Sequence, residues 1–96
     1  MIKFEKTRAM IKLFKREYIS RSEARRLYHG LDKFKVIIFD FKGVKTIGQG
    51  FADELFRVFT QHSPEIRIEI VNLKPSLQTM INHVVDNKIK KRLTIN

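Results

Sequence analysis

The sequence contains no cysteine, which excludes a disulfide framework, a thiolate nucleophile and any zinc or iron–sulfur centre held by cysteine. It also lacks a long apolar stretch. The longest unbroken run of aliphatic or aromatic residues is 36–39, far short of the roughly 20 residues that a helix needs to cross a bilayer. Charged residues between positions 3 and 8 interrupt any secretory leader after Met1. We therefore expect a cytoplasmic protein that does not insert into membranes.

Length and charge balance bound the class of protein. A chain of 96 residues, 43% of them hydrophobic, predicts a single small globular domain over residues 1–96. A chain of this size buries only roughly 60–65% of its extended surface, which excludes a large multi-layer enzyme. The 20 lysines and arginines exceed the 10 acids and give a net charge of +10. Such an excess is typical of proteins that bind a polyanion, such as nucleic acid or an anionic membrane surface.

The positive charge is concentrated at the two ends of the sequence. Residues 1–35 carry a net +7 and residues 73–96 a net +4, whereas residues 36–72 carry −1. The densest group is a candidate polyanion-binding site, called here the N-terminal basic cluster, and it consists of Lys12, Lys15, Arg16, Arg21, Arg25 and Arg26. Charge of this kind also keeps small domains soluble, so it does not by itself identify a nucleic-acid partner.

Periodicity predicts the secondary structure of the first third of the chain. Apolar and polar residues alternate at 2–5 and again at 10–14, which predicts two short strands joined by a tight turn as a hairpin. Ser20 and Glu23 have the spacing of a capping box, in which each side chain bonds the other residue's backbone N–H. A helix should therefore begin after Ser20 and end at Gly30.

The remaining elements follow from composition. Residues 35–41 are apolar on both faces, as expected of a central strand covered on both sides. A glycine-containing turn at 43–50 leads into a helix at 51–59 that is buried around much of its circumference. Alternation predicts a half-buried strand at 66–70, and Pro75 is suited to the first turn of a last helix.

This element order, β-β-α-β-α-β-α, predicts an α/β fold with a mixed sheet of about four to five strands and three helices. Lys88, Lys90, Lys91 and Arg92 predict a basic tail that frays from about residue 88.

Two separated motifs carry a resemblance to a known family. Residues 20–27 form the first, and the second combines the strand at 36–44 with Ile-Gly-Gln-Gly-Phe-Ala-Asp-Glu at 47–54. With these motifs the chain resembles the bacterial STAS-like domain family of unknown function, closely over residues 18–72. It is more distantly similar to the STAS domains of anti-sigma factor antagonists.

The resemblance implies a small βα fold that acts through binding rather than turnover. In the antagonists the strand leads into an Ile-Asp-Ser-Ser-Gly turn whose serine is phosphorylated by a partner kinase. Gly48, Gln49 and Gly50 occupy that turn here and carry no hydroxyl, so we expect no serine phosphoswitch. The resemblance implies a regulatory role, with a protein partner that is a regulator or a kinase-like ATPase.

The glycine turn and the following helix form the candidate partner-binding site. It consists of Gly48, Gln49, Gly50, Asp53, Glu54 and Arg57. Arg57 follows Asp53 by four residues and Glu54 by three, which predicts an exposed ridge of ion pairs. A nucleotide-binding loop is excluded, because Gln49 and Gly50 stand where a lysine and a hydroxyl would hold phosphate and magnesium.

No residues of the sequence form a convincing catalytic group, and we expect no enzyme, cofactor or metal. The three histidines lack metal-ligand spacing. Asp40, near the end of the central strand, either faces the turn as a functional carboxylate or accepts hydrogen bonds from the loop backbone. We therefore predict a non-enzymatic regulatory interaction domain. The alternatives are a nucleic-acid-associated domain that uses the N-terminal basic cluster, and an enzyme that acts through Asp40 with Glu54.

Overall fold

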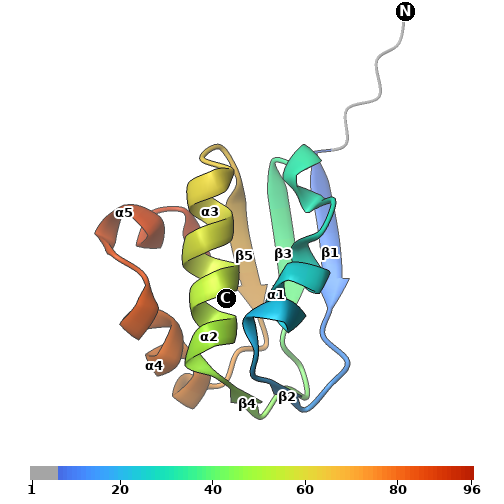
Figure 1. The fold of residues 1–96 in the computed structure, drawn as a ribbon, viewed down its shortest axis with the longest axis vertical. Helices are drawn as coiled ribbons and strands as arrows, with labels where there is room; N and C mark the ends of the chain where they lie inside the picture. The colour runs from blue at the N-terminus through green and yellow to red at the C-terminus, as the bar shows by residue number, and fades with distance from the viewer. Residues whose placement is uncertain (1–6) are drawn as a thin grey trace, which may run out of the picture.

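A four-stranded parallel sheet is the centre of the computed structural model, which describes residues 7–96 (Figure 1). Its strands, in spatial order, are β1 (Arg8–Lys12), β3 (Val36–Asp40), β5 (Arg67–Val71) and β6 (Leu93–Ile95). Met10 lies opposite Ile38, which lies opposite Glu69, and Glu69 is paired with Thr94. The predicted α/β class is confirmed. All the described strand pairs are parallel, so the expected mixed sheet is wrong in this respect.

The expected N-terminal hairpin is also wrong where it can be compared. Residues 2–5 lie outside the described residues. Arg8, placed in the turn of that hairpin, belongs to strand β1, and β1 pairs in parallel with β3. A second, two-stranded parallel sheet, formed by β2 (Glu17–Tyr18) and β4 (Thr46–Ile47), was not predicted. Strands of two residues are too short to show alternation, and their partners lie nearly thirty residues apart in the sequence, so no local pattern predicts this pairing.

Several helical segments accompany the sheet, where three were expected. They are α1 (Arg21–Tyr28), the 3₁₀ helix η1 (Leu31–Lys33), α2 (Gln49–Ala52), the π-helix η2 (Asp53–Val58), α3 (Phe59–His62), α4 (Pro75–Val84) and α5 (Asn87–Lys90). The segments α2, η2 and α3 follow one another without a break and are called the central helix, residues 49–62. Among residues 7–96, no helix has the length and apolar character that crossing a membrane requires.

The predicted start of α1 is confirmed in atomic detail. Ser20 accepts from the backbone N–H of Glu23 at 3.2 Å, and the Glu23 carboxylate accepts in return from the backbone N–H of Ser20 at 3.2 Å. The helix ends at Tyr28, just before Gly30, whose φ of 77° is a left-handed conformation that glycine adopts without strain. Pro75 likewise opens α4, as expected.

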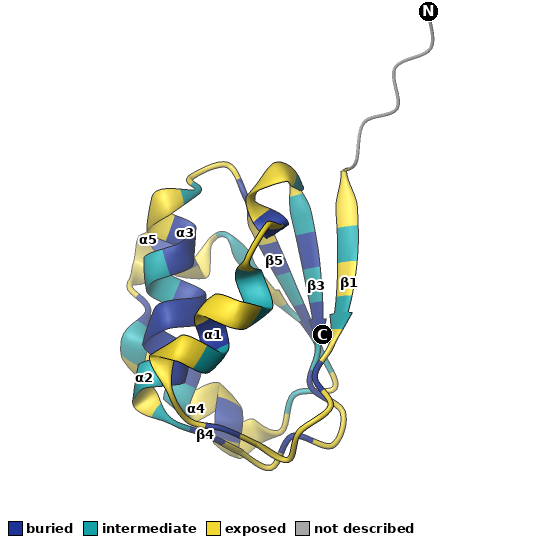
Figure 2. Ribbon diagram, turned by 45° about the vertical axis from the view of Figure 1, so that its right-hand side comes forward, coloured by how far each residue is buried: buried dark blue, intermediate teal, exposed yellow. Residues whose placement is uncertain are grey.

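The helices lie on one face of the sheet (Figures 1 and 2). Ile37, Phe39, Ile68 and Ile70 point toward them and are fully buried. The residues that alternate with these on β3 and β5 are partly exposed or exposed. Strand β3 is therefore central, as predicted, but within the described residues it is covered on one face and not on both.

The central helix packs against the sheet, α1 and α4. Its residues 51–56 are all buried, although a helix with one buried stripe would expose part of such a run. The π-helical turn, in which the N–H of Phe59 donates to the carbonyl of Glu54, lies in this buried part of the central helix. The large side chains of the central helix, Phe51, Leu55 and Phe56, pack with Phe39 and Phe41 in the core.

The C-terminal residues are ordered into α5 and β6, so the expectation of a fraying basic tail is wrong. The reason is Arg92, whose guanidinium turns inward. Its Nη1 donates to the carbonyl of Thr60 at 2.7 Å, and its Nε and Nη2 donate to that of Ile66 at 3.0 and 2.7 Å. It also donates to the carbonyl of Ser63. Burial lowers the pKa of Arg92. The side chain thus satisfies carbonyls at the end of the central helix.

Arg92→Met should lower the free energy of unfolding by about 1–3 kcal/mol, because the carbonyls at the end of the central helix lose their donors. Chemical denaturation of the purified protein measures the change. Arg26→Met is the matched control, since Arg26 is exposed on α1 and arginine and methionine have similar helix propensities. Equal stability of the two variants would show that Arg92 does not anchor the C-terminal residues.

Candidate functional site

The Gly48–Gly50 turn lies against the segment that precedes α1. The N–H of Gly48 donates to the carbonyl of Tyr18 at 2.8 Å, and the N–H of Phe51 donates to that of Ile19 at 3.1 Å. A Cβ atom on Gly48 would lie 2.6 Å from the carbonyl oxygen of Ile19. Glycine at position 48 is therefore required by this close approach. Gln49, which follows it, is exposed.

Asp53 is an internal acid of the central helix and is only 9% exposed. Its Oδ2 accepts from Nη2 of Arg57 at 2.6 Å and from Nη1 of Arg21 at 2.7 Å, and its Oδ1 accepts from Nε of Arg57. Hydrogen bonds from Arg57 and then from Arg21 lower the pKa of Asp53 to about 2, although burial opposes this shift.

Glu54, the next residue, is 4% exposed and faces α1. Its Oε2 accepts from the hydroxyl of Tyr28 at 2.7 Å. Its Oε1 lies 3.6 Å from Nη1 of Arg21 and 3.5 Å from Nη2 of Arg25. Burial, followed by the hydrogen bond to Glu54, raises the pKa of Tyr28 to about 12, which keeps the phenol a donor. The Tyr28 ring stacks on Phe59 with centroids 4.4 Å apart.

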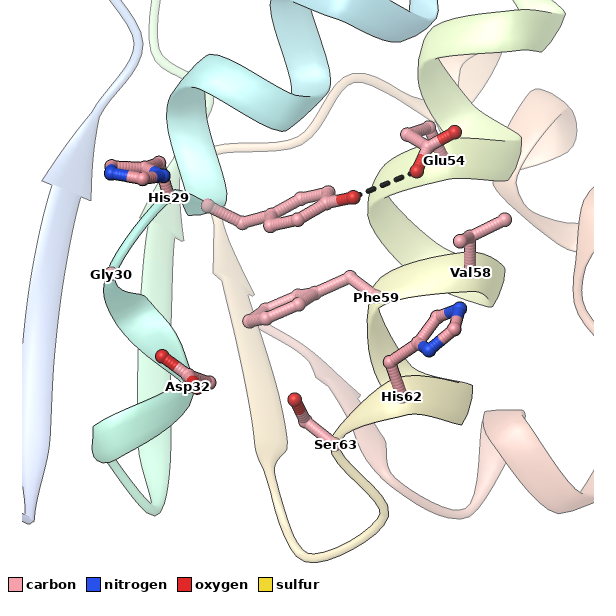
Figure 3. Close-up of a pocket in the computed structure, with 9 residues that line it drawn as sticks. His29, Gly30, Asp32, Glu54, Val58, Phe59, His62 and Ser63 are labelled. Carbon is pink, nitrogen blue, oxygen red and sulfur yellow. Dashed lines mark hydrogen bonds between the residues drawn. The ribbon is translucent and has the colours of Figure 1, made fainter.

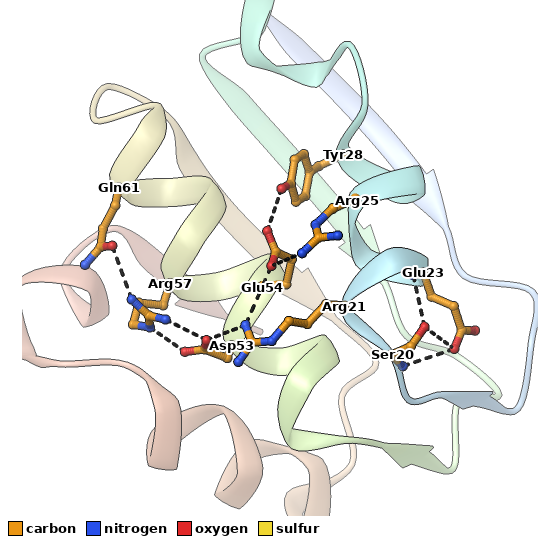
Figure 4. Close-up of polar contacts among 9 residues, drawn as sticks. All are labelled: Ser20, Arg21, Glu23, Arg25, Tyr28, Asp53, Glu54, Arg57 and Gln61. Carbon is orange, nitrogen blue, oxygen red and sulfur yellow. Dashed lines mark hydrogen bonds and ion pairs between the residues drawn. The ribbon is translucent and has the colours of Figure 1, made fainter.

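These side chains form one network that joins α1 to the central helix (Figure 4). We call it the carboxylate–arginine cluster, and it consists of Arg21, Arg25, Tyr28, Asp53, Glu54 and Arg57. The expected exposed ridge is wrong, because both carboxylates are buried against α1. The three arginine side chains remain 39–59% exposed. The cluster can therefore hold guanidinium groups in fixed positions at the surface, each with N–H donors beyond those bonded to the carboxylates.

The cluster brings together residues that the sequence assigned to two separate sites. Asp53, Glu54 and Arg57 belong to the candidate partner-binding site, and Arg21 and Arg25 to the N-terminal basic cluster. Sequence spacing could predict the pair within the central helix, since it is an i, i+4 pair. The contacts across to α1 join positions some thirty residues apart, and no local pattern indicates them.

The other members of the N-terminal basic cluster lie apart from this network. Lys15 pairs with Glu23, and its ammonium lies 5.2 Å from the centre of the Tyr18 ring. Lys12, Arg16 and Arg26 are exposed and form no ion pair with another described residue. Within residues 7–96, half of the six basic side chains thus have no opposite charge in contact.

Asp40 accepts hydrogen bonds from the loop around it. Its Oδ1 accepts from the backbone N–H of Lys42 at 3.0 Å and from the side-chain amide of Asn72 at 2.9 Å. The bond from Asn72 is the main cause of a lowered pKa for Asp40, followed by that from Lys42. Asn72 itself has a φ of 60°. This geometry matches the interpretation in which Asp40 stabilises the loop by accepting hydrogen bonds from it.

An open groove of about 580 Å³ lies beside the cluster, between the end of α1, η1 and the central helix (Figure 3). Tyr28, Phe59 and Glu54 are among the residues that line it, and His29 and His62 lie at opposite sides of it. The sequence analysis did not identify this groove, because its walls come from segments far apart in the chain. Throughout residues 7–96, no three histidine, aspartate or glutamate side chains gather as a metal site requires.

The fold and the cluster define a class: a small α/β domain in which a parallel sheet carries its helices on one face. Residues 23–78 match the family described as STAS-like domain of unknown function (DUF4325). Because this match covers more than half of the chain, the protein belongs to that family, and the expected resemblance is confirmed. The match contains α1 from Glu23 onward, the whole central helix and the start of α4. No curated protein and no solved structure is similar enough to match the chain.

Gly48→Ala should lower the free energy of unfolding by about 1–3 kcal/mol, because the added methyl group would collide with the backbone of Ile19. Gly50→Ala is the matched control. There the Cβ would lie 3.4 Å from Cγ of Arg21 and 3.7 and 3.8 Å from backbone atoms of Ile19 and Arg21, which are ordinary contacts. Alanine in a helix gains up to about 1 kcal/mol over glycine. Thermal and urea unfolding give both values. A neutral Gly48→Ala would contradict the close approach.

Acid should weaken the fold through Asp53. Its pKa is about 2 in the folded protein against an ordinary 3.8, so the stability it contributes is present above about pH 4 and is lost as the pH falls toward 2. The stability difference between the wild type and Asp53→Asn should therefore shrink over this range. Denaturation curves measured from pH 6 to pH 2 test it, with Asp32→Asn as the control at an exposed position. A difference that does not change with pH would contradict the assignment.

Proposed function

We propose that this protein is a non-enzymatic regulatory domain that binds another protein. The proposed docking surface is the Gly48–Gly50 turn together with the outward guanidinium groups of Arg21 and Arg57. Membership of a STAS-like family supports a binding role, since STAS domains act through binding rather than turnover. The partner is a regulator or a kinase-like ATPase, in transcriptional or signalling control.

The observation that carries the proposal is the carboxylate–arginine cluster. Buried carboxylates hold Arg21 and Arg57 in place, so little side-chain entropy remains to be lost when a partner binds. The two arginine side chains are 47% and 39% exposed, and their guanidinium groups retain unused N–H donors. Arginine is enriched at protein interfaces, where it bonds acidic groups and carbonyls. A partner that offers carboxylates or carbonyl oxygens suits this surface.

The proposal does not include a serine phosphoswitch. Gly48, Gln49 and Gly50 carry no hydroxyl, and the nearest one along the chain belongs to Thr46, within strand β4. Release of the partner would therefore not depend on phosphorylation of the turn.

The polar contacts of the candidate acids support a non-enzymatic role. Asp40 is bonded to Lys42 and Asn72 beside the ends of the strands, whereas Glu54 is bonded to Tyr28 and faces the arginines of α1. The two carboxylates share no hydrogen-bond partner, and each already accepts from a neighbouring group. An acid–base pair needs two carboxyl groups that reach one substrate.

The nucleic-acid alternative is weaker after the charges are placed. Arg21, Arg25 and Lys15 are paired with carboxylates, which cancels part of the positive field that a phosphate backbone would meet. Lys12, Arg16 and Arg26 are the members of the N-terminal basic cluster that would carry nucleic-acid binding, since they form no ion pair with another described residue. Retention on heparin that falls steeply with salt, and that Arg16→Glu with Arg26→Glu abolishes, would favour this alternative over the proposal.

Gln49→Glu tests the proposed surface. A negative charge at the start of the central helix favours the helix, so the fold should be retained. It should repel the acidic groups of a partner and reduce capture of that partner at least about tenfold, the loss typical of an interface hot spot. Affinity capture by the tagged full chain from its source cells, quantified by mass spectrometry, measures the loss.

Gln78→Glu is the matched control, since Gln78 is exposed near the start of α4 and undergoes the same change. Arg57→Ala provides a second variant on the proposed surface, where Asp53 keeps its bond from Arg21. If both Gln49→Glu and Arg57→Ala proteins are folded and capture the same proteins as Gln78→Glu in equal amounts, the proposed surface is wrong.

A further inference from the structure

The sheet face that points away from the helices forms a second surface. The strand register places outward residues in rows across the sheet. Val36 lies between Arg8 and Arg67, Ile38 between Met10 and Glu69, and Asp40 between Lys12 and Val71. We call these side chains, with Phe14 and Lys42, the open sheet face. Figure 2 shows strands β1, β3 and β5 without a helix over this side.

The open sheet face gathers the most exposed large apolar side chains among residues 7–96. Met10 is 60% exposed and Phe14 is 88% exposed. Phe14 continues the outward alternation of β1, because the N–H of Leu13 bonds the carbonyl of Asp40 and the Leu13 side chain is buried. Exposed apolar residues that cluster, rather than scatter singly, mark interaction sites.

The charges around this apolar strip are unbalanced. Arg8 pairs with Glu69 at 3.0 Å, and Asp40 accepts from Lys42 and Asn72 through neutral N–H groups. Across the described part of the chain, Lys12, Lys42 and Arg67 form no ion pair. The charges of Lys12 and Lys42 do contribute to the lowered pKa of Asp40. The open sheet face therefore offers Met10, Phe14, Val36, Ile38 and Val71 among four cations and only two carboxylates, an excess of positive charge.

A parallel sheet with one face that no helix among residues 7–96 covers is unusual, because helices normally cover both faces of parallel sheets. We propose that the open sheet face binds an amphipathic helix of a partner protein, with the apolar side of that helix on Met10, Phe14 and Ile38. Acidic residues at the edges of the helix would meet Lys12, Lys42 and Arg67. The net charge of +10 disfavours a second copy of this chain as the occupant, since the same cations would face one another.

This surface is separate from the one proposed for regulation. The carboxylate–arginine cluster lies among the helices, on the other side of the sheet. The inference goes beyond the proposed function, and a variant at Gln49 should leave binding to the open sheet face unchanged. Failure at one surface is therefore distinguishable from failure at the other.

The test uses the full chain and a designed peptide of about 18 residues, about 27 Å long as a helix, with leucine along one side and glutamate elsewhere. Fluorescence anisotropy should show that it binds, and that Met10→Asp or Phe14→Asp weakens binding at least about tenfold. Ile19→Asp is the matched control, since Ile19 is 48% exposed but lies beside Gly48. It should bind as the wild type does.

Other results would overturn the proposal. A scrambled peptide of the same composition that binds equally well would show that binding depends on charge alone and not on an amphipathic helix. Perturbation of α1 amides in NMR spectra would place the peptide at the wrong surface. A peptide with lysine in place of glutamate that binds as tightly would show that the ligand need not be acidic. A dimer in sedimentation that Met10→Asp dissolves would show a second copy as the occupant. Nuclear Overhauser contacts from Ile2 or Phe4 to Ile38 would show that the chain covers the face itself.

Discussion

The order of the strands determines the arrangement of everything else in this fold. Each of the strands β1, β3 and β5 is followed by helix and then by its parallel neighbour in the main sheet, so that the chain advances across the sheet in one direction. Crossovers of this type have one strongly preferred hand, and successive crossovers in one direction then deliver their helices to the same face. The central helix consequently lies between α1 and α4, and the opposite face of the sheet receives no helix from the described residues. Both surfaces discussed above follow from this single constraint.

The position of the central helix also explains its acids. Asp53 and Glu54 lie past the first turn of the central helix, where the helix dipole would favour a solvated carboxylate. Here the neighbouring α1 covers them, and burial of a charge is costly unless it is paired. Arg21 and Tyr28, on the side of α1 that faces the central helix, supply the hydrogen bonds that compensate this cost. Removing one partner from such a network leaves the other charge buried, and for this reason breaking it is more costly than its net contribution suggests.

Local patterns predicted those parts of the fold that depend on local physics. The capping box of α1, the apolar strand at 36–40, the buried helix after Gly50 and the proline at the start of α4 all express preferences within a few residues. The parallel pairing of β1, the two-residue strands and the strand at 93–95 depend on partners distant in sequence, and their segments are too short to show a period. The site divides in the same way. The contact of Arg57 with Asp53 follows from helical spacing, whereas the arginines of α1 reach the same acids only because the fold packs the two helices together.

The net charge acquires a different meaning once each residue is placed. A count of +10 treats all cations alike, but Arg92 is directed inward to carbonyls and Arg21 and Arg25 to carboxylates. These arginines serve first as donors that satisfy buried oxygens, and a lysine could not replace their planar fork of N–H groups. The cations with no partner in the described residues include Lys12, Lys42 and Arg67, beside exposed apolar side chains on the open sheet face. Because an apolar strip with an excess of cations beside it favours an amphipathic acidic ligand over a bare polyanion, the location of the charge is more informative than its sum.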